Sequence, residues 1–233
     1  MCGAERKENE KGDPMSSITT KGQKIIKKKL KASSKDWLRR QLDDPYVREA
    51  QAKGYRARAA FKLLEIDEKF GVLKGRQRVV DLGCAPGSWA QVCAKQGMKV
   101  VGIDLLPCDP MAGATFLEGD FMTDEGEAAI TEALGKLGKL GPDLVLSDLA
   151  ANTVGHAATD GLRTQNLTEL AVAFALKHTA IGGHFVTKIF MNGFENDVKK
   201  QLGGIFTRIQ LYKPPSSRAE SRETFLVAMD RKA

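Results

Sequence analysis

After Gly75, short apolar runs rich in β-branched residues alternate with helical segments, and this alternation limits the possible folds more than any other feature. Strands that alternate with helices predict an α/β fold, in which a mainly parallel sheet is covered by helices on both faces. We expect strands over residues 78–82, 99–104, 115–118, 144–147, 184–189, 207–212 and 224–229. The helices expected between them cover residues 89–95, 127–137, 161–179 and 195–202.

The net charge of +7 is unevenly distributed along the 233 residues. Residues 1–62 hold 17 Lys and Arg against 8 Asp and Glu, whereas the remaining residues hold 19 against 21. We therefore expect residues 1–34 to be a basic, flexible arm for a polyanion, with a solubilising tail as the alternative. Residues 35–233 are expected to form one domain, whose segment 35–74 is helical and whose core is 75–233.

Within the helical segment, Asp44 and Pro45 are typical of a helix start, because aspartate caps a helix and proline suits its first position. Apolar residues at helical spacing predict a second helix over 57–70, closed by Gly71.

The cysteines and histidines exclude several classes of protein. No C-x-x-C pair occurs, and the three histidines show no metal-ligand spacing, so we expect neither disulfides nor a metal. No apolar run approaches a membrane span, and the first ten residues contain no signal sequence. We expect a soluble, cytoplasmic protein; a mitochondrial location is left open, although the N-terminal acids suit a presequence poorly.

A turn between the first predicted strand and helix indicates a cofactor loop, V-V-D-L-G-C-A-P-G-S-W, over residues 79–89. Gly83 and Gly87 allow close backbone approach to a ligand, and Trp89 follows them. A dinucleotide fold needs G-x-G-x-x-G to hold a pyrophosphate, but here the middle glycine is missing and Pro86 has no N–H. The loop therefore suits an amino-acid group better than a nicotinamide cofactor.

Acidic residues follow the next strands and complete this interpretation. Asp81, Asp104, Asp120 and Asp148 all fall at strand ends, which meet at one edge of a parallel sheet. Asp104 could accept hydrogen bonds from both ribose hydroxyls, and Asp120 from an adenine amine, with Phe121 packing nearby. Although a lone strand-end aspartate is often only a helix cap, their order favours S-adenosylmethionine as the cofactor.

Four residues suit the removal of a proton from a ribose hydroxyl: Lys62, Asp148, Lys188 and Glu223. A lysine accepts a proton only as the neutral amine, which burial and a nearby cation favour. We assign Lys188 as the proton acceptor and Lys62 as the cation, with Asp148 orienting Lys188 and Glu223 positioning Lys62 or the ribose. Taken singly, Lys62 could be a surface charge, Asp148 a helix cap and Glu223 an arginine partner. A lysine inside a central strand, as Lys188 is, is harder to explain otherwise.

In these contexts, R-A-A-F-K, V-L-S-D, H-F-V-T-K and S-R-E-T-F, the chain resembles the FtsJ-type ribose 2′-O-methyltransferases, from about Ser34 onward. The resemblance implies a Lys-Asp-Lys-Glu tetrad and the Rossmann-like fold of class I S-adenosylmethionine-dependent methyltransferases, with seven strands, one antiparallel. The string D-L-L-P at 104–107 favours the branch that methylates a uridine of large-subunit ribosomal RNA. One departure is L-A-A-N at 149–152, where the family has a pattern close to M-A-P-N, which puts placement of the target base in doubt.

Arginines near the tetrad are candidates for RNA phosphate contacts, because their guanidinium groups suit phosphate oxygens. The candidates are Arg56, Arg58, Arg218 and Arg222. We expect a monomer that acts on the large ribosomal subunit. Two alternatives stay open: a transfer RNA ribose 2′-O-methyltransferase, and an RNA-binding assembly factor whose catalysis is dispensable.

Overall fold

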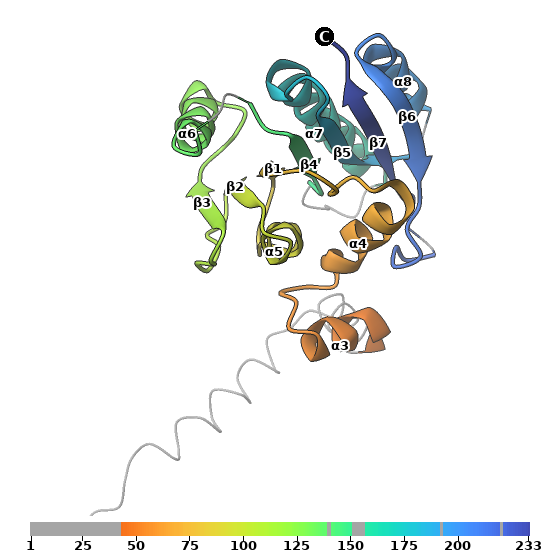
Figure 1. Ribbon diagram of the computed structural model, residues 1–233. Coiled ribbons are helices and arrows are strands. Elements are labelled where there is room, and N and C mark those ends of the chain that lie inside the picture. Colours follow the sequence, from red (N-terminus) through yellow and green to blue (C-terminus); the bar gives the residue numbers. More distant parts are fainter. Residues whose placement is uncertain (1–42, 139–140, 151–156, 192, 220) are drawn as a thin grey trace, which may run out of the picture. The chain divides into compact units, whose positions relative to one another are not determined.

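The computed structural model describes residues 43–138, 141–150, 157–191, 193–219 and 221–233. Residues 45–233 form one compact unit, built on a seven-stranded sheet in the order β3-β2-β1-β4-β5-β7-β6 (Figure 1). The order reverses direction between β1 and β4, which is where ligands bind in open α/β sheets. The predicted basic arm, residues 1–34, lies outside the described residues.

All seven strands form where the apolar runs predicted them. They are β1 (Arg78–Leu82), β2 (Lys99–Asp104), β3 (Ala114–Glu118), β4 (Leu144–Ser147), β5 (His184–Phe190), β6 (Phe206–Tyr212) and β7 (Glu223–Arg231). The pairings from β3 through β5 are parallel, whereas β7 lies antiparallel between β5 and β6. The predicted Rossmann-like sheet with one antiparallel strand is therefore confirmed.

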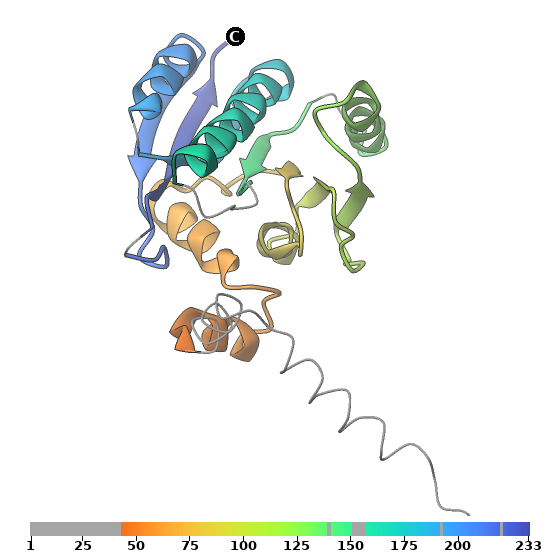
Figure 2. The ribbon, with the colours of Figure 1, turned by 180° about the vertical axis from the view of Figure 1, so that it is seen from behind.

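Helices cover both faces of this sheet (Figure 2). The helices are α3 (Pro45–Ala52), α4 (Ala59–Phe70), α5 (Ser88–Lys95), α6 (Asp124–Gly135), α7 (Ala157–His178) and α8 (Phe194–Gly203). Apolar residues of α6, α7 and α8 pack in one core, and those of α4 and α5 pack in the other. In the described part of the chain, no helix combines the length and hydropathy that a membrane crossing requires.

The alternation of side chains along β1 explains why the strand is buried throughout. Val80 and Leu82 belong to the core under α7, whereas Val79 belongs to the core under α4 and α5. Every residue of β1 is buried, because helices cover both faces of the strand. The same alternation points Asp81 toward α5, where its Oδ2 accepts a hydrogen bond from the Ala90 N–H at 3.1 Å.

Helix α4 begins at Ala59 and ends where Gly71 adopts a left-handed conformation, at a φ of 66°. The Gly71 N–H bonds the Asp67 carbonyl oxygen, so the predicted closure by this glycine is confirmed. Leu63 and Ile66 are fully buried against the sheet, whereas Lys62 lies at the margin of that buried face. This position allows Lys62 to reach the edge of the sheet.

Helix α6 begins three residues before the predicted start at residue 127. The Thr123 hydroxyl oxygen accepts a hydrogen bond from the Gly126 N–H at 3.1 Å and caps the helix. Asp124 and Glu125 then lie in the first turn, where the positive end of the helix dipole favours acids. The prediction relied on apolar spacing and missed this polar start signal.

Gly83, directly after β1 in the predicted cofactor loop, lies against the side chain of Leu149. Its φ is +71°, and a Cβ added there would lie 2.2 Å from Leu149 Cδ2. Leu149 follows β4, and Leu82 pairs with Ser147, so the two turns lie side by side. A side chain at position 83 would therefore displace the side chain of Leu149.

Gly83→Ala should lower the free energy of unfolding by more than Gly75→Ala does. Both glycines have a positive φ, which costs about 1–3 kcal/mol for other residues. At Gly75, however, nothing lies within 4 Å of the added Cβ. Urea denaturation of both variants measures the difference, and adding Leu149→Ala to Gly83→Ala should recover part of the loss. Equal destabilisation by the two single substitutions would contradict the collision with Leu149.

Candidate active site

The pairing of β4 with β5 brings two of the four predicted residues together. Ser147, the last residue of β4, pairs with Thr187, so Asp148 follows level with Lys188 of β5. The Lys188 Nζ lies 3.2 Å from Asp148 Oδ1 and donates to the Asp148 carbonyl oxygen at 2.9 Å. The strand lysine is therefore held by both the side chain and the backbone of Asp148.

Glu223 joins this pair because β7 runs antiparallel to β5. It is the first residue of β7 and pairs with Phe190, at the carboxyl end of β5. Lys188 pairs with Phe225, and residues two apart on a strand share a face, so Glu223 and Lys188 point to the same side of the sheet. This side carries α4, and therefore Lys62.

Lys62 completes the cluster by bridging the two acids. Its Nζ lies 3.0 Å from Glu223 Oε1 and 3.2 Å from Oε2, and 3.6 Å from Asp148 Oδ2. The order of contacts is thus Glu223, Lys62, Asp148 and Lys188, with alternating charge. The structure brings all four predicted catalytic residues together from four separate elements.

Burial strengthens these contacts. The side chain of Lys188 is 6% exposed, and those of the other three residues are 12–18% exposed. Removing one member of such a cluster leaves a partner charge uncompensated in a poorly solvated place. The Lys62 Nζ also lies 5.5 Å from the centroid of the Phe225 ring, which adds a cation–π contact.

The predicted cofactor loop lies next to this cluster, at the reversal point of the sheet. Asp104, at the end of β2, accepts a hydrogen bond from the Ala85 N–H through Oδ2 and from the Leu106 N–H through Oδ1, both at 2.9 Å. Asp104 therefore fastens the loop after β1 to the end of β2. Each carboxylate oxygen has a second lone pair and can still accept a ligand hydroxyl.

A small hollow of about 50 Å³ joins the loop to the cluster. Its lining includes Gly83, Pro86 and Trp89 from the loop and Asp148 from the cluster. One buried polar atom of this lining, Ser88 Oγ, has no hydrogen-bond partner among the described residues, whereas Asp148 Oδ1 is engaged by the ion pair with Lys188. Trp89 closes the wall, because its indole N–H donates to the Ala59 carbonyl oxygen at 2.8 Å. Gly87 stands at the start of α5 with a φ of 94°.

Two further predicted cofactor residues follow β3. The Asp120 Oδ1 accepts a hydrogen bond from the Met122 N–H at 2.9 Å, in the turn before α6. Phe121 is buried in the core under α7, where its ring packs edge-on against the Phe174 ring, with the ring centroids 6.3 Å apart. Contact of either residue with an adenine stays a prediction, and Phe121 already has a packing role.

Residues 55–231 match the model of the FtsJ-like methyltransferases. The chain belongs to this family. The match includes the whole sheet, the loop and all four clustered residues, so the family resemblance expected from the motifs is confirmed.

Similar proteins of known name agree with this membership. The chain is 54% identical over 203 residues to a ribosomal RNA large subunit methyltransferase E of Novosphingobium aromaticivorans, covering 86% of this chain and 90% of the relative. It is 51% identical over 213 residues to the protein of the same name from Sinorhizobium fredii, covering 89% and 85%. A crystal structure of a Plasmodium falciparum protein assigned as a ribosomal RNA methyltransferase superimposes with a TM-score of 0.67 at 32% identity, covering 76% of this chain and 98% of that one.

Asp81 is a residue of this FtsJ-like methyltransferase to which sequence reasoning gave no role. It is 2% exposed and lines the small hollow beside Asp148. Burial, followed by the charges of Asp148 and Asp104, raises the pKa of Asp81 to about 8, against the hydrogen bond from Ala90. The signal in the sequence was an acid directly after two valines of a predicted strand.

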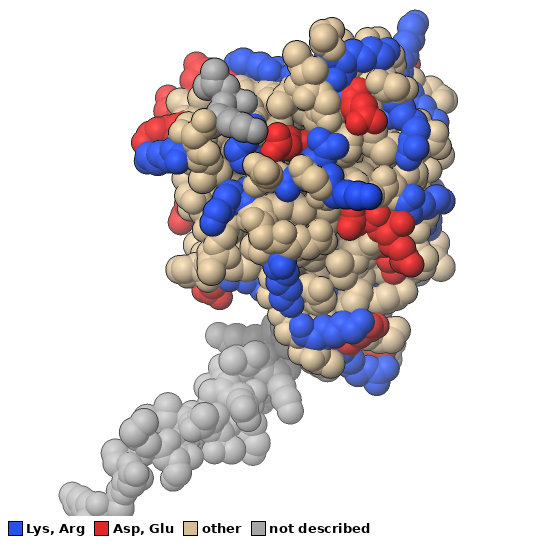
Figure 3. Space-filling view, in the orientation of Figure 1, with Lys and Arg blue, Asp and Glu red and all other residues tan. Residues whose placement is uncertain are grey.

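The structure gives two of the four candidate RNA-binding arginines backbone partners. Arg56 donates to the carbonyl oxygens of Pro86 in the cofactor loop and of Asp109 after β2, and Arg58 donates to the Ser216 carbonyl oxygen. Arg218 is half-buried and Arg222 exposed, in the segment leading to Glu223. On the face shown in Figure 3, basic and acidic side chains are interspersed, in keeping with a nearly neutral core. RNA contact by any of the four stays a prediction.

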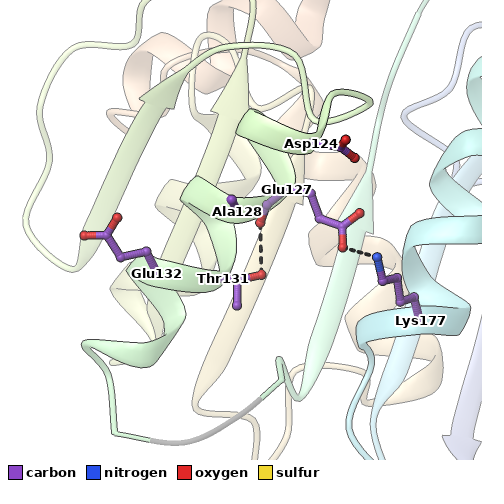
Figure 4. Close-up of a pocket in the computed structure, with 6 residues that line it drawn as sticks. All are labelled: Asp124, Glu127, Ala128, Thr131, Glu132 and Lys177. Atoms are coloured by element: carbon purple, nitrogen blue, oxygen red, sulfur yellow. Dashed lines mark hydrogen bonds and ion pairs between the residues drawn. The ribbon is translucent and has the colours of Figure 1, made fainter.

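A separate hollow of about 440 Å³ lies between α6 and α7, away from this site (Figure 4). Its described lining contains none of the predicted site residues. Lys177 of α7 points to Glu127 of α6 and forms an ion pair, and the Thr131 hydroxyl donates to the Glu127 carbonyl oxygen. We attribute this hollow to the packing of the two helices.

Asp81→Asn should make stability less dependent on pH. An unfolded carboxyl titrates near pH 4, so the folded chain retains a proton on Asp81 that the unfolded chain loses between about pH 4 and about pH 8. Over that range, rising pH lowers the wild-type free energy of unfolding, whereas asparagine has no charge to bury.

Melting temperatures between about pH 5 and about pH 9 measure this effect. The Tm of Asp81→Asn minus that of wild type should rise with pH. Asp197→Asn, at an exposed position on α8, serves as the control, and its difference from wild type should stay constant. Parallel curves for wild type and Asp81→Asn would show that Asp81 does not titrate as described.

Proposed function

We propose that this FtsJ-like methyltransferase transfers a methyl group from S-adenosylmethionine to the ribose 2′-hydroxyl of a uridine in large-subunit ribosomal RNA. The observation that carries the proposal is the contact of buried Lys188 with Asp148, directly beside a glycine-bounded loop at the reversal point of the sheet. Asp148 thus contacts the proposed proton acceptor and also lines the hollow beside the cofactor loop. This arrangement supports a proton acceptor close to the proposed methyl donor.

The residues present fit S-adenosylmethionine. Ser88 Oγ is buried at the hollow without a hydrogen-bond partner among the described residues, and such an atom favours a polar ligand. The hollow, at about 50 Å³, has room for only one small group, so the cofactor would extend over the ends of β2 and β3. Asp104 and Asp120 lie there and would hold its ribose and adenine. When bound, S-adenosylmethionine supplies an electrophilic methyl group.

Lys188 is the proposed proton acceptor for the ribose hydroxyl. It can take the proton only as the neutral amine. The Asp148 carboxylate contacts the Nζ atoms of both Lys188 and Lys62, so its negative charge is shared between the two lysines. Glu223 forms an ion pair with Lys62 and fixes its position, so Lys62 stays in contact with Asp148.

The choice of RNA rests on the relatives, whose names specify the large ribosomal subunit. Arg218 and Arg222 lead into Glu223 and are the proposed phosphate contacts, which fix the register of the RNA without reading its bases. Action as a monomer, in the cytoplasm, is part of the same proposal.

Lys188→Met should abolish methyl transfer while S-adenosylmethionine still binds. Methionine has a similar length but accepts no proton, and loss of a general base typically costs about a hundredfold or more in rate. The measurement is transfer of label from S-adenosylmethionine to intact large subunits, naked ribosomal RNA and transfer RNA in parallel, followed by mapping of the 2′-O-methyl group.

Lys74→Met, at an exposed position after α4, is the matched control and should behave as wild type. We expect label on large subunits with wild type and Lys74→Met only. Label from Lys188→Met at the wild-type rate would exclude the proposed base. Label on transfer RNA alone would replace the proposed substrate, and no label on any RNA would favour the assembly-factor alternative.

Deletion of residues 1–34 should weaken RNA binding and reduce its dependence on salt. This segment, outside the described residues, holds nine Lys and Arg against four Asp and Glu. The logarithm of the RNA association constant falls linearly with the logarithm of the salt concentration. Each phosphate that the arm neutralises should make this slope steeper by about 0.7–0.9, so the deletion should make it shallower. Deletion of residues 1–10 removes two basic and three acidic residues and is the control. The same slope for the full chain and the 1–34 deletion would refute a role for the arm.

A further inference from the structure

Arg56, between α3 and α4, connects segments that lie far apart in the sequence. Its Nη1 donates to the Pro86 carbonyl oxygen at 2.9 Å. Its Nη2 donates to the carbonyl oxygens of Asp109 at 2.7 Å and Pro110 at 3.1 Å. The Gln91 Oε1 accepts a hydrogen bond from the Arg56 backbone N–H at 2.9 Å. Arg56 thus bonds to three separate segments.

These parts are the elements that the proposed cofactor site is made of. Pro86 belongs to the loop after β1, Gln91 lies on α5, which starts at that loop, and Asp109 belongs to the segment after β2. Asp104 joins the same two segments through its bond with the Ala85 N–H. The loop after β1 and the segment after β2 are therefore tied twice, by a carboxylate and by a guanidinium.

The surroundings of Arg56 are shaped to admit its guanidinium. The group lies over the ring of Phe116 in β3, 5.5 Å from the ring centroid. A Cβ added at Gly87 would lie 2.7 Å from Arg56 Nη1 and 3.0 Å from Phe116 Cζ. Gly87 therefore leaves the space in which arginine and ring meet.

The chemistry of the contacts requires arginine. Its planar guanidinium has five N–H donors in a fixed fork, so one group can bond carbonyls of two segments at once. Lysine has the same charge, but its donors all lie on one nitrogen and cannot reach the carbonyl oxygens of both segments in the same way. A contact made only for charge would not need three carbonyl partners.

We propose that Arg56 is a positioning residue that holds the loop after β1 and the segment after β2 in the arrangement that binds S-adenosylmethionine. This role takes the place of the phosphate contact expected from the sequence, and it rests on the proposed function of the site. Arg56 acts through the backbone of these two segments. Without it, cofactor binding must also order the segments, which lowers affinity.

The substitution Arg56→Ala should raise the Kd for S-adenosylmethionine about tenfold or more, and Arg56→Lys should restore little of the affinity. At saturating cofactor the methylation rate should stay near that of wild type, because Arg56 touches none of the four clustered residues in the contacts described. RNA affinity and its salt slope should be unchanged. Calorimetry with S-adenosylmethionine and RNA titrations at several salt concentrations measure these quantities.

Arg222→Ala is the matched arginine control, since its proposed contact is RNA phosphate. It should reduce the salt slope by about 1 and leave the Kd for S-adenosylmethionine unchanged. If Arg56→Ala behaved in this way instead, Arg56 would be a phosphate contact and the inference would be wrong.

Hydrogen exchange of the free protein gives a second readout that needs no ligand. Arg56→Ala should speed amide exchange in residues 83–87 and 105–110 and leave β5 and β7 unchanged. Unchanged exchange in those two segments, or an increase over the whole sheet, would overturn the inference. If wild type failed to bind S-adenosylmethionine, the proposed cofactor would be wrong, and the exchange comparison would still decide whether Arg56 orders the two segments.

Discussion

The hydrogen-bond register of β5 with its two neighbours decides which side chains meet at the active site. Ser147 opposite Thr187 sets Asp148 level with Lys188, and Phe190 opposite Glu223 brings the acid of β7 to the same edge. A slip of one residue in either pairing would move a side chain to the other face of the sheet. The buried apolar residues on both faces of β5 prevent such a slip, so the two cores fix the geometry of the site.

Acidic charge is concentrated where the sheet order reverses. In addition to burial, the charges of Asp148 and Asp104 raise the pKa of Asp81, so negative charge from two sides acts on this carboxyl group. A cationic ligand would reduce that repulsion, and the proposed methyl donor carries a sulfonium. Lys62 and Lys188 balance the side of the crevice next to α4, whereas the side next to the loop is balanced by backbone N–H groups.

Much of this arrangement could be predicted from the sequence, because apolar runs mark buried strands and acids mark their ends. The strands 78–82, 99–104 and 144–147 have the predicted bounds. The strand order could not be derived from spacing, and the antiparallel strand was implied only by the family resemblance. The start of α6 was misplaced because one threonine cap outweighed the apolar pattern.

Arg56 shows a different limit of sequence reasoning. Its carbonyl partners Pro86 and Asp109 lie 30 and 53 residues away, and a backbone oxygen leaves no mark in a sequence. An arginine that ties loops therefore has the same sequence signature as one that binds phosphate. Phe121 was likewise read as a cofactor neighbour, and only the fold reveals the aromatic partner, Phe174, that it meets in the core.

Strand β7 lies between β5 and β6 in the sheet but follows both of them in the sequence. Among the described strands β6 pairs only with β7, so β5 and β6 both emerge from the ribosome before their common partner exists. Until then each presents an open edge that invites wrong pairing with other chains. The same strand brings Glu223, the partner of Lys62. In a growing chain, closing the sheet and completing the active site are therefore one event.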